Sequence, residues 1–102
     1  SPNVPEPGNA RSAADVVVLR DGKRVLRVVA PGATRVEVRA DATEWRPVAL
    51  APDGRHWSPP LRLEPGTQRL LVRIDGGEWM PPANLPTVDD EFGTRVGLLV
   101  VP

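Results

Sequence analysis

Short apolar runs separated by turn-forming dipeptides make up most of this 102-residue sequence. Residues 16–19 form one run and residues 24–29 the next, and between them stands Asp21-Gly22, a dipeptide that favours a two-residue hairpin turn. Such runs recur at roughly the 8 to 12 residue spacing that is typical of a β-sandwich. We therefore predict that the first two runs pair as antiparallel strands.

Two further runs alternate strictly between apolar and polar residues, which predicts strands with one core face and one solvent face. In residues 35–40 the two valines and the alanine point to the predicted core, and the charged residues between them point to water (Arg35, Glu37 and Arg39). Residues 69–74 place a leucine, a valine and an isoleucine on the core face. They leave Leu71 exposed on the outer face between Arg69 and Arg73.

The remaining runs are shorter. Residues 48–50 are apolar. Trp57 lies in a predicted strand, and we expect its side chain to fill the core. Pro59-Pro60 place their segment at a sheet edge or a bulge, because proline lacks the N–H that a strand donates to its neighbour. A loop is expected over residues 81–91 and a last strand over residues 96–101. Thirteen prolines and the absence of sustained helical periodicity argue against helices. The predicted fold is an all-β antiparallel sandwich of about seven to eight strands.

The beginning of the chain differs in composition from the rest. Residues 1–14 are rich in small residues and proline and contain almost no large apolar side chain, which is typical of a flexible linker. Residues 15–102 suffice for one domain with a single modest core. Because a domain that begins with a linker is usually attached to something, we expect this to be the C-terminal module of a larger protein.

Charge and composition narrow the class of partner. Thirteen Lys and Arg residues balance thirteen Asp and Glu residues, and the signs are interspersed, so we expect no binding to nucleic acid. No apolar run approaches the roughly 18 residues that a membrane helix needs, so we expect no membrane insertion. The chain has no cysteine, which excludes a disulfide framework and a thiolate metal site and leaves the cellular compartment open.

The sequence offers little for catalysis. His56 is the only histidine, and no serine or acid stands at a spacing that would make it part of a catalytic triad, so we expect a structural position. Asp89-Asp90-Glu91 is the densest acidic cluster, but it lacks the ligand spacing of a calcium loop and is interpreted as a solvated turn. We expect a non-enzymatic domain with no catalytic residue, no cofactor and no metal.

The aromatic residues carry more information about function. Besides Trp57 there are only Trp45, Trp79 and Phe92, and the two tryptophans stand in loops or at strand ends. Two interpretations are open for them. The indoles either cap the core from one end, or expose their faces to a ligand such as a sugar ring, whose C–H groups pack on a flat aromatic surface.

Three segments resemble a known family in order and in spacing: APGATRVEVRADATEW, LEPGTQRLLVRIDGGEW and PTVDDEFGTRVGLLVV. With them, residues 25–102 resemble the glycogen-binding domain of the AMP-activated protein kinase beta subunit, and more broadly the family 48 carbohydrate-binding modules. The resemblance implies an early-set immunoglobulin-like sandwich that binds α-glucan, such as glycogen or starch, without catalysis.

The resemblance also implies which residues bind the ligand. Trp45 and Trp79 fall on the two stacking tryptophans of the family, and Phe92 falls on an apolar residue that lies along the sugar. Thr94 matches a threonine that binds hydroxyl groups. We expect these four side chains to form one exposed surface.

Two positions depart from the family pattern. Leu71 stands where the family has a lysine, and Val96 stands where it has an asparagine. A site that recognises hydroxyls through hydrogen bonds loses most when those partners are replaced, so a sugar site here is expected to be weakened or retuned. Arg69 and Arg73 share the predicted outer face of Leu71 and are candidate substitute donors.

Two functions follow from these residues. The leading one is a carbohydrate-binding module for α-glucan or another oligosaccharide. The alternative is an interaction module in which the same apolar patch, rimmed by arginine, docks onto a protein partner or onto a neighbouring domain of the same polypeptide, with glycan binding lost.

Overall fold

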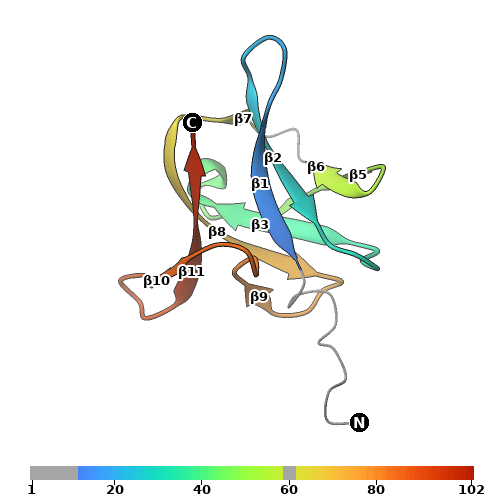
Figure 1. Cartoon of the computed structure of the whole chain (residues 1–102). Helices are drawn as coiled ribbons and strands as arrows, with labels where there is room; N and C mark the ends of the chain where they lie inside the picture. The colour runs from blue at the N-terminus through green and yellow to red at the C-terminus, as the bar shows by residue number, and fades with distance from the viewer. Residues whose placement is uncertain (1–11, 59–61) are drawn as a thin grey trace.

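Two antiparallel sheets pack face to face in this computed structural model, which describes residues 12–58 and 62–102 (Figure 1). Within these residues the only helical element is a short 3-10 turn, Asp41–Thr43, and the rest of the regular structure is strand. The prediction of an all-β antiparallel sandwich is therefore confirmed. The strands are shorter and more numerous than expected, because several contain only two or three residues.

The first sheet has the strand order β1-β2-β6-β5, and β7 pairs with the first two residues of β2. Its strands are β1 (Ala13–Val18), β2 (Arg24–Val29), β5 (Ala51–Asp53), β6 (His56–Ser58) and β7 (Arg62–Leu63). The predicted pairing of the first two runs is confirmed, with Ala13 opposite Val29 and Val18 opposite Arg24.

The β1–β2 turn is wider than the two-residue turn that Asp21-Gly22 predicts. The amide of Leu19 donates to the carbonyl of Lys23 at 2.8 Å, and the amide of Gly22 donates back to the carbonyl of Leu19 at 2.9 Å. Gly22 has a φ of 85°, which glycine adopts without strain. This hairpin projects beyond the two sheets in Figure 1.

The second sheet carries the candidate site and is organised around β8 (Gly66–Ile74), its longest strand. Its order is β10-β11-β8-β3-β4, and β9 pairs with the second half of β8. The partners of β8 are β3 (Val36–Ala40), β9 (Trp79–Met80) and β11 (Arg95–Val101), and the outer strands are β4 (Val48–Ala49) and β10 (Thr87–Asp89).

The core lies between the sheets and follows the predicted alternation. β3 and β8 pair in a register that sets Val38 opposite Val72 and Ala40 opposite Leu70, and these four side chains are buried. Trp57 of β6 packs against this core while staying partly exposed. The buried apolar cluster consists of Ala14, Leu26, Val28, Ala30, Val36, Val38, Ala40, Leu50, Leu63, Leu70, Val72, Ile74, Leu99 and Val101.

The outer face of the second sheet is more buried than the alternation of apolar and polar residues predicts. Leu71, predicted to be exposed, is only 4% exposed, and Glu37, predicted to face water, is only 6% exposed. Both predictions were wrong because alternation assigns a side chain to a face but says nothing of what covers that face. Here the Trp79 ring and the Arg73 guanidinium lie together on this face, and Arg73 pairs with the buried carboxylate of Glu37, which needs a charged partner.

Two boundaries differ from the sequence prediction. Ala13 and Ala14, assigned to the linker, lie in β1, and Ser12 is buried and accepts a hydrogen bond from the amide of Ala83. Part of the expected loop over residues 81–91 is strand β10, which is too short and too exposed to give an alternation signal. Residues 1–11 and the segment of Pro59, Pro60 and Leu61 lie outside the described residues.

Glu37 provides a test of this outer face. Its hydrogen bond from the Arg73 guanidinium, against the opposing effect of burial, holds the pKa of Glu37 below its usual value, with help from Arg35. A lowered folded-state pKa contributes stability that is complete above the unfolded pKa, about 4.3, and is lost as the pH falls through the folded pKa. Replacing Glu37 by Gln should therefore lower the free energy of unfolding at pH 7 by about 2 kcal/mol, the net value of hydrogen bonds to a charged group.

Urea denaturation at a series of pH values measures this effect. The difference between wild type and Glu37→Gln should be constant above about pH 5 and shrink below about pH 4.3. The exposed Glu64, changed to Gln, is the matched control and should show no such loss. An equal loss of stability at every pH would contradict the ionic role of Glu37.

Candidate functional site

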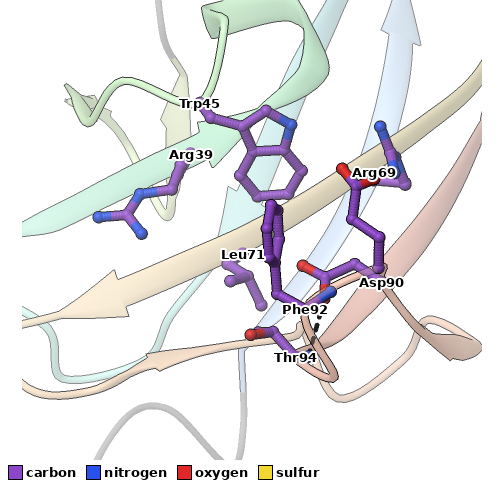
Figure 2. A pocket seen from close by; sticks show the side chains of 8 residues that line it. Arg39, Trp45, Arg69, Leu71, Asp90, Phe92 and Thr94 are labelled. Carbon is purple, nitrogen blue, oxygen red and sulfur yellow. Dashed lines mark hydrogen bonds between the residues drawn. The ribbon is translucent and has the colours of Figure 1, made fainter.

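Five of the eight predicted binding residues line one open cavity on the outer face of the second sheet. The cavity has a volume of about 490 Å³ and lies between the turn that follows β3, the middle of β8 and the β10–β11 turn (Figure 2). The predicted residues in its wall are Trp45, Arg69, Leu71, Phe92 and Thr94, and the other wall residues are Arg39, Asp90 and Glu91. Segments far apart in the sequence thus build one site.

Trp45 is held in place by the tight turn that follows β3. The amide of Trp45 donates to the carbonyl of Ala40 at 2.9 Å, and the hydroxyl of Thr43 bonds the backbone of Ala40 at 3.0 Å. Glu44 and Trp45 have φ values of 55° and 62°, in the left-handed region that non-glycine residues rarely adopt. The turn therefore directs a large aromatic side chain outward, into the cavity wall, at some cost in backbone energy.

One carboxylate, that of Asp41, ties this turn to β8. It accepts hydrogen bonds from the indole Nε1 of Trp45 at 3.1 Å, from the amide of Arg69 at 2.8 Å and from Nη2 of Arg69 at 3.1 Å. Burial disfavours its charged form, but these hydrogen bonds outweigh burial and hold the pKa of Asp41 below its usual value. The Asp41 carboxylate thus fixes both the Trp45 ring and the Arg69 guanidinium.

Phe92 stands at the tip of the β10–β11 turn, and 83% of it is exposed. The turn is closed by the side chain of Asp90, whose Oδ1 accepts from the amides of Phe92 at 2.9 Å and Thr94 at 2.8 Å (Figure 2). Gly93, with a φ of 79°, allows the sharp reversal. Asp90 therefore holds an exposed apolar ring and the Thr94 hydroxyl beside the same cavity.

Trp79 does not line the cavity but lies next to it, in contact with two arginines. The guanidinium carbon of Arg39 is 4.4 Å from the centre of the Trp79 ring, and that of Arg73 is 4.7 Å from it, both within cation–π range. Arg73 also donates two hydrogen bonds to Glu37, at 2.9 and 3.0 Å. The predicted stacking surface of Trp79 is thus engaged by cationic side chains of its own chain.

The two apolar departures from the family pattern differ in their access to a ligand. Leu71 is buried but still contributes to the cavity wall, whereas Val96 is 0% exposed and does not line the cavity. Val96 and Leu71 lie outside the main core cluster, so they form part of the apolar support beneath the outer surface. Direct contact between Val96 and a ligand, as predicted from the resemblance, does not fit this burial.

Sequence reasoning missed three residues of the cavity wall and the carboxylate that organises it. Arg39, Asp90 and Glu91 line the cavity, and Asp41 holds two of its residues. Strand alternation does place Arg39 on the outer face, but only the β3–β8 register sets it opposite Leu71. An aspartate directly after a strand, four residues before a tryptophan, was the available signal for Asp41.

Comparison with known proteins gives no match from which a function could be transferred to this chain. No protein-family model matches the chain, and a search of the curated proteins found no match. Among residues 12–58 and 62–102, no group of three acidic or histidine side chains is placed to hold a metal ion, and no helix has the length and apolar character needed to cross a membrane. His56 lies half-buried in β6 of the other sheet, away from the cavity.

The role of Asp41 is testable by replacing it with Asn, which keeps the shape but removes the charge. The amide group faces two donors, Arg69 and Trp45, with only one acceptor oxygen. The free energy of unfolding should fall by about 1 kcal/mol, and the Trp45 indole Nε1–H signal should move in a ¹H–¹⁵N spectrum. Asp53→Asn, at an exposed site in β5, is the control. Unchanged stability together with an unchanged Trp45 signal would contradict the role of the Asp41 carboxylate in holding Trp45 and Arg69.

Proposed function

We propose that this chain is a non-catalytic carbohydrate-binding module whose outer-face cavity takes part of an α-glucan chain. The observation that carries the proposal is the joint placement of Trp45 and Phe92 in one open cavity whose rim bears both hydrogen-bond donors and acceptors. Sugars present apolar C–H faces and a ring of hydroxyls, so a flat aromatic surface with polar groups at its edge is complementary to them.

The polar groups of the cavity favour a neutral polyol over a charged ligand. Two arginines, Arg39 and Arg69, face two carboxylates, Asp90 and Glu91, and Thr94 adds a hydroxyl that both donates and accepts. Because the charges balance, the cavity has no strong field of one sign. Its volume of about 490 Å³ lies within the range of small-molecule sites. The choice of α-glucan among neutral glycans rests on the resemblance of the sequence.

Trp79 has a supporting role in this proposal. Its ring carries the guanidinium groups of Arg39 and Arg73, so it orders the polar edge of the site rather than offering a bare face to the sugar. One stacking platform and one exposed phenyl ring make a smaller apolar contact than two free indoles. We therefore expect binding in the micromolar to millimolar range, about 4 to 8 kcal/mol of binding free energy.

The alternative, docking of a protein partner or a neighbouring domain on the same surface, is favoured by the exposure of Phe92. A phenyl ring that is 83% exposed at the tip of an ordered turn is a typical anchor for a partner pocket. In that case Phe92 would contribute most of the binding energy, and the polar rim would contribute little. The two functions therefore differ in which variants abolish binding.

A titration with maltoheptaose, followed by calorimetry and tryptophan fluorescence, tests the proposed function. Wild type should bind, and Trp45→Ala should lose roughly 1 to 3 kcal/mol of binding free energy, by analogy with stacking of bases on aromatic side chains. Trp57→Phe, which changes a tryptophan of the other sheet, is the matched control and should bind as wild type does. No heat and no fluorescence change at millimolar maltoheptaose would rule out the glucan function.

A further inference from the structure

We infer that Arg39 recognises the hydroxyl oxygens of the bound sugar and is the main hydrogen-bond donor of the cavity. The inference rests on the proposed glucan function and adds to it the residue that determines polar recognition. Neither strand alternation nor the family resemblance points to this residue, because alternation assigns it to bulk solvent. The arginines of this surface differ in what they already bind.

Two of the three arginines on the outer face of β3 and β8 are already engaged by carboxylates. Arg69 bonds Asp41 through its amide and its guanidinium, at 2.8 and 3.1 Å. Arg73 bonds both oxygens of Glu37, at 3.0 and 2.9 Å. Using either guanidinium for a ligand would mean breaking a charge-assisted pair, so neither is a good substitute donor.

Arg39 differs from both. Within the described parts of the chain its guanidinium has no carboxylate partner, and its Nε, although buried, has no hydrogen-bond partner. Since Nε is buried, the part of Arg39 that can meet a ligand is the terminal end of the guanidinium, which no carboxylate of the described residues engages. A sugar hydroxyl that reaches this side chain therefore gains a hydrogen bond without displacing any existing one.

The position of Arg39 suits this role. It lines the cavity and is the register partner of Leu71 across the β3–β8 ladder, so it stands beside the apolar position on which a sugar would rest. Its guanidinium lies over the Trp79 ring, which restricts its motion and leaves the donor edge free. In Figure 2 Arg39 extends on the opposite side of Leu71 from Arg69 and Asp90.

This arrangement divides the site by chemistry. Asp90 and Glu91 supply acceptors on the side of the β10–β11 turn, and Arg39 supplies donors on the side of β3. A planar guanidinium with parallel N–H groups suits two neighbouring oxygens, such as the vicinal hydroxyls of a hexose. The ligand then extends from Phe92 across Leu71 towards Arg39, which requires more than one sugar unit.

The test compares maltoheptaose binding by wild type, Arg39→Leu and Arg20→Leu. Arg20 lies exposed beyond the other sheet, so its replacement makes the same change in charge and side chain without touching the cavity. Arg39→Leu should raise Kd about tenfold, the loss expected for hydrogen bonds from a charged donor, while its Tm stays within about 2 °C of wild type or rises. Arg20→Leu should bind as wild type does.

A purely structural role for Arg39 predicts something else, a fall in Tm with Kd unchanged once the protein is folded. Measuring Tm and Kd on the same sample of Arg39→Leu separates the two roles. If Arg39→Leu fails to fold, Arg39→Lys replaces it. This variant keeps the charge but loses the planar fork, and should raise Kd about threefold.

The outcomes also separate this inference from the proposed function. If wild type binds maltoheptaose and Arg39→Leu, or Arg39→Lys in its place, binds within twofold of it, the inference is wrong and the glucan function stands. If wild type does not bind, the glucan function is wrong and the role of Arg39 in it falls as well. A selective tenfold loss in Arg39→Leu with an unchanged Tm supports both.

Discussion

The register between β3 and β8 is the constraint on which the core and the candidate site both depend. It sets Val38 opposite Val72 on the inner face and, one residue along, Glu37 opposite Arg73 and Arg39 opposite Leu71 on the outer face. Because side chains alternate with a period of two, a slip by one residue would turn the apolar set to solvent and bury the charged set. The buried valines and leucines of the inner face therefore fix the outer pairs, and the geometry of the site is a consequence of core packing.

The outer face is ordered by carboxylates rather than by apolar packing alone. Glu37 and Asp41 each take one arginine of β8, and in doing so they position aromatic rings, since Arg73 lies over Trp79 and Asp41 bonds the Trp45 indole. Exposed ion pairs add little stability, but pairs that are half-buried and joined to other groups hold side chains in defined places. The consequence is a surface on which one arginine, Arg39, remains without a carboxylate partner among the described residues.

The sequence predicted the sandwich and several residues that line the cavity, and the failures of prediction have physical reasons. Alternation in β3 and β8 identified the core face because a buried face requires apolar side chains at every second position. The resemblance brought Trp45, Leu71, Phe92 and Thr94 together, and the structure places them around one cavity. It did not predict the burial of Leu71 and Val96 or the contact of Trp79 with two arginines, because these depend on which segments cover the sheet. Which carboxylate an arginine pairs with depends on the tertiary structure and leaves no local pattern in the sequence.

We propose that the outer face of the second sheet binds a sugar chain, with Trp45 as its platform and Arg39 as its free donor. The most direct measurement is a ¹H–¹⁵N titration with maltoheptaose that follows the indole Nε1–H signals of the three tryptophans and the Nε–H signals of the arginines. We predict that the signals of Trp45 and Arg39 move together and saturably while the indole signal of Trp57, on the other sheet, stays in place. Signals that do not move, or that move only at Trp57, would contradict it.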